Sequence, residues 1–331
     1  MEERTKEIIE FLDDIDELYS DMRKDIENIT AKAMFEKITT LIEIDTDSPL
    51  YHMFLVMCDD IDSSFSTGTD PAHHNRQHFI EVMANCFIIG KFHGLDDDTI
   101  AKLMFTGLIH DYKHPGILGI GTIGGDLAGQ PSRAEILSCR EARKLLLSKK
   151  GTVYTRKDVD KIFAFATPLI VPTDVFSKPT VELVDLLKSS QSPKTLKTSL
   201  KKHIKKMKKS KAPKELIECA KYFYQNPQCI EYLLIVLESD ILSSCLLPTV
   251  PKMTDTNIAI ETGRKDMSVL QQLRGQLAFM NDQGRKCFGQ ESHPFHAIFE
   301  SRRQKVANEL RALEETPDIP QPELVIATGR E

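Results

Sequence analysis

The sequence predicts an all-α protein, in which a compact multi-helix domain follows an N-terminal amphipathic helix. Apolar residues recur at spacings of three and four through most of residues 50–310, as in TIAKLMFTGLIHDY, RAEILSCREARKLLL and KELIECAKYFY. The strict alternation of apolar and polar residues that a half-buried strand needs is rare. Turn-forming residues gather in LGIGTIGGDLAGQPS, which predicts a long Gly-rich loop over residues 118–132.

The chain divides into three predicted parts. Residues 1–45 hold apolar side chains at helical spacing between acids and lysines, which predicts an amphipathic helix over residues 5–44. This helix could pack on the body of the protein or pair with a second copy in a homodimer. Residues 46–310 form the main helical domain. Residues 311–331 contain three prolines and little to bury, which predicts a disordered tail.

Composition and charge argue against nucleic acid as a partner. The 331 residues include 43 Lys and Arg and 49 Asp and Glu, which gives a net charge of −6. Seven scattered cysteines, never spaced as CxxC, predict free thiols in a reducing compartment. The charged N-terminus has no signal-peptide pattern, and no apolar run approaches the roughly 18 residues that span a membrane. We therefore expect a soluble, cytoplasmic protein.

Two short stretches outside this plan suggest interactions. The segment from Lys194 to Lys214, KTLKTSLKKHIKKMKKSKAPK, holds ten lysines and reads most simply as a solvated insertion at about residues 190–214. Alternatively, its apolar residues would line one helix face, and the segment would rest on an anionic membrane or partner. The stretch NELRALEETPDIP faintly resembles the glutamate-rich secretion signals of bacterial effectors, which makes a secreted effector a second hypothesis for localisation.

Two groups of histidines, HHNRQH at 73–78 and HDYKH at 110–114, indicate a candidate metal site. His74 and His78 are four residues apart, so on a predicted helix they share one face. A second predicted helix is periodic up to Tyr112 and places His110 and Asp111 at its end.

A hydrolytic metal site needs a further protein ligand besides two imidazoles and one carboxylate. Asp240 is the candidate, because it is embedded in the apolar run YLLIVLESDILSS, where an unpaired charge is costly. The alternative is that Asp240 caps a helix or faces solvent.

HHNRQH followed by HDYKHPG resembles the HNxxH and HDxxHPG signatures of the class I cyclic nucleotide phosphodiesterases. These are all-helical members of the HD-domain metal-dependent phosphohydrolases. SRAEILSCREARKLL, RKDVDKIFAFAT, SDILS and GQLAF resemble further family segments, so the resemblance covers about residues 50–285. Departures lie at the family's paired histidines, here Leu137 and Ser138, and at the Asp after Ala-Thr, here Pro168, with Asp174 as a shifted equivalent. The spacing from SDILS to GQLAF also looks short.

The resemblance implies two divalent ions and a set of residue roles. A first ion, suited to Zn²⁺, would be held by His78, His110, Asp111 and Asp240. Asp111 would bridge to a second ion, Mg²⁺ or Mn²⁺. The waters of that ion would be oriented by His114, Glu135 and Thr167. His74 would act as general acid for the departing 3′-oxygen, and a purine would be clamped by Gln276 and Phe279. Asn75 would fix local geometry or start a helix, and His73 and His93 read as structural.

Three functional hypotheses follow. The first is hydrolysis of a 3′,5′-cyclic nucleotide, cAMP or cGMP or both, to the 5′-monophosphate. The second is an HD phosphohydrolase that acts on another nucleotide or phosphodiester. The third is a catalytically inactive binding protein that keeps the phosphodiesterase fold.

Overall fold

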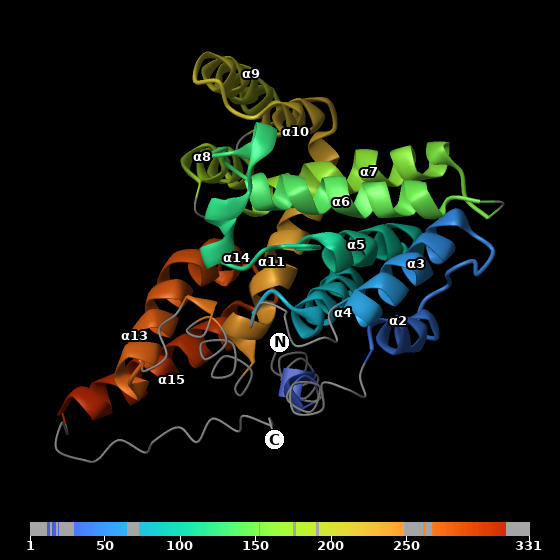
Figure 1. Ribbon diagram of the computed structural model, residues 1–331. Helices are drawn as coiled ribbons and strands as arrows, with labels where there is room; N and C mark the ends of the chain where they lie inside the picture. Colours follow the sequence, from blue (N-terminus) through green and yellow to red (C-terminus); the bar gives the residue numbers. More distant parts are fainter. Residues whose placement is uncertain are drawn as a thin grey trace.

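The structure is a computed structural model that describes residues 12–13, 15–17, 19, 30–64, 73–151, 153–174, 177–189, 192–247, 258, 261–262 and 267–315. These residues form helices and loops without a strand, so the predicted all-α class is confirmed (Figure 1). The described α-helices are α2 (Ala31–Thr39), α3 (Pro49–Ser64), α4 (Arg76–Phe92), α5 (Asp97–Ile109), α6 (Arg133–Lys149), α7 (Arg156–Ile170), α8 (Lys178–Lys188), α9 (Pro193–Lys209), α10 (Lys214–Gln225), α11 (Ile230–Leu246), α13 (Val269–Phe279), α14 (Arg285–Phe288) and α15 (His296–Glu315).

Helix α4 is the centre of the fold. Nearly all of its side chains from Arg76 to Gly90 are buried, as expected for a helix that is apolar around most of its circumference. Helices α5 and α11 pack against α4 and against each other. The outer helices surround this trio: α6 and α7 lie side by side on one flank, and α13 and α15 pair at one end of the molecule (Figure 1).

Buried polar contacts set the register of α4 against α11. Asn85 Nδ2 donates a hydrogen bond to the Ser239 carbonyl oxygen at 2.8 Å, and the Tyr19 hydroxyl donates one to Asn85 Oδ1 at 2.9 Å. Asn85 is fully buried, and an unpaired polar group in such a place costs about 1–3 kcal/mol. These bonds therefore hold Asp240, the neighbour of Ser239, at a fixed height along α4.

The N-terminal segment differs from the single helix predicted over residues 5–44. Thr30 begins a separate helix, because its side chain accepts a hydrogen bond from the Ala33 N–H, and that helix, α2, ends at Thr39. Leu12 and Tyr19 each expose only 1% of their surface and are part of the core. The described residues of the segment thus pack on the body of the protein, and the homodimer stays a prediction.

The predicted start of the tail is also wrong. Helix α15 continues to Glu315, so residues 311–315 are helical. The physical reason is that Leu310 and Leu313 pack against the core and Glu314 pairs with Arg274 of α13. Residues 316–331 lie outside the described residues.

A comparison of the described helices with the dimensions of a bilayer finds none that is both long and apolar enough to cross a membrane.

The close approach of α5 to α4 depends on Gly107. A Cβ atom there would lie 2.9 Å from Cys86 Sγ and 3.0 Å from the Val82 carbonyl oxygen, and the backbone oxygen cannot move aside. We expect Gly107→Ala to lower the free energy of unfolding by about 1–3 kcal/mol in urea titrations. Gly275→Ala is the matched control, because a Cβ on this exposed glycine of α13 meets no atom within 4 Å. It should be neutral or raise stability by up to about 1 kcal/mol. Equal effects of the two substitutions would contradict the packing described.

Candidate metal centre and active site

Four side chains from three helical segments converge on one point. His110 Nε2 lies 3.1 Å from Asp111 Oδ2 and 3.5 Å from Asp240 Oδ1. His78 Nε2 lies 3.6 Å and 3.3 Å from the same two oxygens. His78, His110 and Asp111 are buried, and the Asp240 side chain is 24% exposed. The structure therefore brings together the four residues that the sequence predicts as ligands of the first ion.

The start of α4 positions His78. Asn75 is the N-cap, and its Oδ1 accepts a hydrogen bond from the His78 N–H at 3.2 Å. His74 precedes this cap, so the prediction that His74 and His78 share a helix face is wrong. The helix-start role considered for Asn75 is confirmed.

The end of α5 positions His110 and Asp111. The helix ends at Ile109, three residues before the predicted end at Tyr112, and His110 is its C-cap. Lys113 and Gly116 then adopt positive φ angles of 61° and 77°, which reverse the chain direction. Because Asp111 lies beyond the last helical turn, its carboxylate can turn back toward the His110 ring.

His110 is held in one tautomer. Its Nδ1 lies 2.7 Å from the Gly107 carbonyl oxygen, which can only accept a hydrogen bond, so Nδ1 carries the proton. In the neutral ring Nε2 keeps a lone pair, and this buried nitrogen forms no hydrogen bond within the described part of the chain, although the carboxylates of Asp111 and Asp240 face it. A metal-binding histidine usually donates one ring N–H to a neighbouring carbonyl and keeps the lone pair of its other nitrogen for the metal.

The negative charge of the two carboxylates favours a cation in the cluster. Burial would raise the pKa of Asp111 and of Asp240, but the facing imidazoles hold both pKa values well below their usual range. Burial would lower the pKa of His78 and of His110, but the two carboxylates raise both. Two ionised carboxylates in a largely buried pocket attract positive charge, either as protons on the imidazoles or as a metal ion.

The imidazole–carboxylate separations of the cluster are close to those around a tetrahedral ion. Bonds of about 2.0–2.2 Å place the ligands of a tetrahedral Zn²⁺ about 3.3–3.6 Å apart. The four imidazole–carboxylate separations of the cluster, 3.1–3.6 Å, match this spacing closely. The ligand atoms of His78, His110 and Asp111 all lie within 4.8 Å of one another. Asp240 does not belong to this group, but its carboxylate approaches both imidazoles. The donor set therefore fits a divalent metal.

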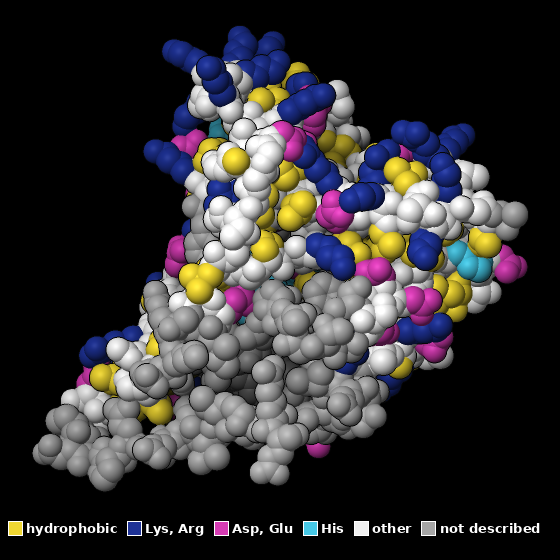
Figure 2. Space-filling model, in the orientation of Figure 1, with side chains coloured by type: hydrophobic (Ala, Val, Ile, Leu, Met, Phe, Trp, Pro, Cys, Tyr) yellow, Lys and Arg dark blue, Asp and Glu magenta, His cyan; other side chains and the backbone are white. Residues whose placement is uncertain are grey.

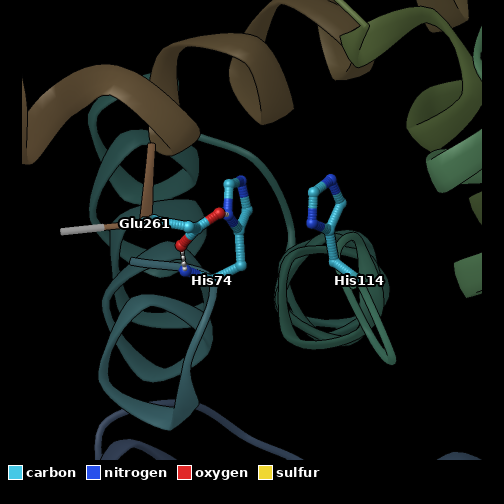
Figure 3. Close-up of side chains that lie close together, drawn as sticks. All are labelled: His74, His114 and Glu261. Atoms are coloured by element: carbon cyan, nitrogen blue, oxygen red, sulfur yellow. Dashed lines mark hydrogen bonds and ion pairs between the residues drawn. The ribbon is translucent and has the colours of Figure 1, made fainter. Parts of the chain in front are cut away.

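His74 is held beside these ligands by Glu261, a residue that the sequence reasoning missed. His74 Nδ1 lies 2.5 Å from Glu261 Oε1, and His74 Nε2 faces Asp111 Oδ2 at 3.8 Å. On its other side the His74 ring stacks on His114, with ring centroids 3.9 Å apart (Figure 3). His74 is thus clamped between a carboxylate and a second imidazole, with one nitrogen directed at the metal ligands.

Glu261 also ties together two loops. Its carboxylate accepts hydrogen bonds from the backbone N–H groups of His73 at 2.8 Å and of Ile117 at 2.6 Å. Burial would raise the pKa of Glu261, but the hydrogen bonds from His74 and from these backbone groups hold it well below its usual value. The ionised carboxylate therefore fixes both the loop before α4 and the loop after α5.

The three residues predicted to orient the waters of the second ion lie in different surroundings. His114 Nδ1 accepts a hydrogen bond from the Gly116 N–H, and burial lowers the pKa of His114 to about 4, so its Nε2–H is free to donate. Burial and the carboxylates of Asp174 and Asp111 raise the pKa of Glu135 well above its usual value, which places Glu135 near the centre. Thr167 on α7 contacts Cys139 and Cys219. The water-orienting roles of these three residues stay predictions.

The hollow beside the metal ligands does not contain the predicted purine clamp. Asp240 lines a hollow together with Asp174 and Gln283. Gln276 lines a different hollow, next to Arg302 on α15. A π-helical turn, Met280–Gly284, follows α13 and contains Gln283. The placement of Gln276 gives no support to the clamp, and the roles of Gln276 and Phe279 stay predictions.

A second histidine–carboxylate cluster joins His93, Glu238 and His293, and the sequence reasoning took His93 as structural. His293 Nδ1 accepts a hydrogen bond from the Phe295 N–H at 3.1 Å, so in the neutral ring Nε2 carries the proton. That proton faces Glu238 Oε2 at 3.3 Å. A nitrogen that carries a proton is no metal ligand, so this cluster suits an internal contact between imidazole and carboxylate better than a metal ion.

Comparisons with known proteins agree with the fold described. No protein-family model and no curated protein sequence matches the chain. The crystal structure of the phosphodiesterase domain of the Salpingoeca rosetta rhodopsin phosphodiesterase superposes with a TM-score of 0.56 and 10% identity, over 87% of this chain and 88% of that one. A crystal structure of the phosphodiesterase domain of the RhoPDE fusion protein from the choanoflagellate Salpingoeca rosetta gives 0.55 and 12%, over 88% and 93%.

The chain therefore has the fold of a phosphodiesterase domain. This is the fold that the resemblance to the class I cyclic nucleotide phosphodiesterases implies, so the resemblance is confirmed at the level of fold.

Loss of Asp111 should empty the metal centre. Its carboxylate contacts both imidazoles of the cluster, so Asp111→Ala should leave less than about a tenth of the metal bound by the unmodified chain, measured by elemental analysis of purified, dialysed protein. His74→Ala is the control and should keep its metal, because His74 Nδ1 is already bonded to Glu261. Full metal content in the Asp111 variant would contradict the ligand assignment.

Proposed function

We propose that this protein is a metal-dependent phosphodiesterase that hydrolyses a 3′,5′-cyclic nucleotide, cAMP or cGMP or both, to the 5′-monophosphate. The observation that carries the proposal is the convergence of two imidazoles and two carboxylates on one point, with a further imidazole directed at them. The phosphodiesterase fold supports the reaction class, and the intact ligand set argues against an inactive binding protein.

Two divalent ions complete the proposed centre. His78, His110, Asp111 and Asp240 would hold the first, for which the nitrogen and oxygen donors suit Zn²⁺. Asp111 would also reach the second, Mg²⁺ or Mn²⁺, with His114 and Glu135 orienting its waters and Thr167 kept as a further candidate. When bound, such ions lower the pKa of water and offset the charge of the phosphate.

His74 is proposed as the general acid. Glu261 holds the Nδ1 side of the ring, which leaves Nε2 as the nitrogen that exchanges protons with the substrate. The orientation places Nε2 beside Asp111, where the phosphate would lie. A positioned acid that protonates the departing 3′-oxygen typically contributes about 10²–10⁴ in rate. Glu261 acts through His74, so we assign it as a positioning residue.

The hollow beside Asp240 is the proposed place for the base. Its walls include the apolar side chains Val181, Leu237 and Ile241, and Gln283 supplies an amide. Such a mixture of apolar walls with a few polar groups suits a planar heterocycle. The purine clamp proposed for Gln276 and Phe279 competes with this assignment.

One observation favours another phosphodiester as the substrate. Lys188 and Lys286 also line the hollow, and although Lys286 pairs with Asp282 and Lys188 donates to the Lys286 carbonyl oxygen, their positive charge suits a more anionic substrate than a cyclic nucleotide. This second candidate keeps the metal centre and His74 in the same roles.

The proposed compartment is a reducing one, in line with a cytoplasmic protein. All seven cysteines are free thiols, and six of them are buried.

Turnover by purified, metal-loaded protein tests the proposal. cAMP, cGMP, a nucleoside 5′-monophosphate and a base-free activated diester form the substrate panel. We expect release of the 5′-monophosphate from a cyclic nucleotide. His74→Ala should lower this rate about 10²–10⁴-fold with metal retained, and Glu261→Gln should lower it by about tenfold. His52→Ala, on α3, is the control. Hydrolysis of the monophosphate or of the base-free diester alone would support the second candidate, and no turnover of any substrate would overturn both.

The same panel decides which amide reads the base. If Gln276 or Gln283 contacts the base, changing that residue to alanine should slow cyclic nucleotide turnover about tenfold. Turnover of the base-free diester should not change, because only the cyclic nucleotide uses the amide. Equal losses on both substrates would show that the residue supports the fold.

A further inference from the structure

The lysine-rich stretch forms α9 and the turn that follows it, and this helix has two opposed faces. Leu196, Leu200 and Met207 are buried, and Ile204 is half-buried, against the neighbouring helices α8 and α10. The apolar face is therefore part of the protein core. The apolar face is thus covered by protein and is not available to contact a bilayer, and the stretch is a packed helix of the fold rather than a solvated insertion.

The other face carries only positive charge. All ten lysines from Lys194 to Lys214 are exposed, and the chain has no Asp or Glu between Asp185 and Glu215. Within the described part of the chain, Lys206 alone of these ten forms an ion pair, with Glu182. Figure 2 shows the lysine side chains gathered at one end of the molecule. We call this surface the α9 lysine face.

The charge of the rest of the chain opposes that of the α9 lysine face. Without the ten lysines, 33 Lys and Arg remain against 49 Asp and Glu, a net charge of −16. An anionic surface would attract this one end and repel the remainder, which fixes an orientation as well as a contact.

The chemistry of the face favours a lipid surface over a nucleic acid. Residues 193–214 contain neither arginine nor an aromatic residue. Nucleic-acid interfaces rely on arginine forks for phosphates and bases and on aromatic rings for stacking. Lysines are compact point charges, and a row of them on a protruding helix suits the diffuse negative potential of phospholipid headgroups. Lys197, Lys201, Lys205 and Lys208 form such a row at spacings of four, four and three.

We propose that the α9 lysine face docks this protein onto an anionic phospholipid surface by electrostatic attraction alone, without insertion. Helix α9 packs on α8, and Val181, Val184 and Asp185 of α8 line the hollow beside Asp240. Docking would hold that hollow one helix away from the lipid. The inference does not depend on the proposed catalytic function.

Co-sedimentation with vesicles tests the inference without any measurement of turnover. The full chain should bind vesicles of phosphatidylcholine mixed with phosphatidylserine at low salt, lose that binding as salt rises, and ignore vesicles of phosphatidylcholine alone. Changing Lys197, Lys201, Lys205 and Lys208 together to glutamine should reduce binding by about tenfold or more. Glutamine has a helix propensity close to that of lysine, so the variant should keep its circular dichroism spectrum and melting temperature.

A matched variant removes the same charge elsewhere. Lys149, Lys150, Lys157 and Lys161 are exposed on and between α6 and α7, and their joint change to glutamine should leave binding intact. Equal binding by the α9 variant and the unmodified chain, equal losses in both variants, or equal binding to neutral vesicles would overturn the proposal. So would a duplex DNA or a single-stranded RNA that displaces the protein from anionic vesicles at matched charge concentration.

Discussion

Two carboxylates and two imidazoles share one largely buried pocket, and the centre of this fold is arranged to keep them there. Asp111 and Asp240 could not remain ionised in such a place without a nearby positive charge, because burial alone would cost several kcal/mol per ion. The facing rings of His78 and His110 reduce that cost, and both are buried. Helices α4, α5 and α11 supply these residues, and the close packing at Gly107 and the hydrogen bonds of Asn85 fix their relative positions. The position of the candidate metal ligands therefore depends on the packing of the core.

A second set of contacts connects this centre to its loops. The carboxylate of Glu261 binds His74 and the backbone of two loops that flank the ligands, and the same carboxylate approaches Gly116 so closely that a Cβ there would lie 3.2 Å from Oε1. Glycine at this position thus allows both the positive φ angle of the backbone and the close approach of Glu261. The proposed acid depends on a contact between segments 187 residues apart.

The sequence predicts the fold class, and it also singles out the four side chains that the structure brings together, because their signals are local. Helical periodicity is visible within any two turns, His78, His110 and Asp111 lie in short motifs, and Asp240 stands out as an acid in an apolar run. Other features depend on tertiary contacts that no short segment reveals. The cap at Asn75 excluded His74 from α4, and the hydrogen bonds of Glu261 come from residues remote in sequence. Gln283, which lies in the π-helical turn after α13, lines the hollow with Asp240, whereas Gln276 lines another one. The apolar face of α9 could be read from periodicity, but only the packing of α8 and α10 showed that it is covered.

The central claim, that His78, His110, Asp111 and Asp240 hold a divalent metal, is tested most directly by anomalous diffraction from crystals grown with zinc. Data collected on both sides of the zinc absorption edge locate the ion independently of the protein atoms. We expect a peak within bonding distance, about 2.0–2.2 Å, of the two imidazole Nε2 atoms and of an oxygen from each carboxylate. No peak at this point, or a peak only at the cluster of His93, Glu238 and His293, would contradict it.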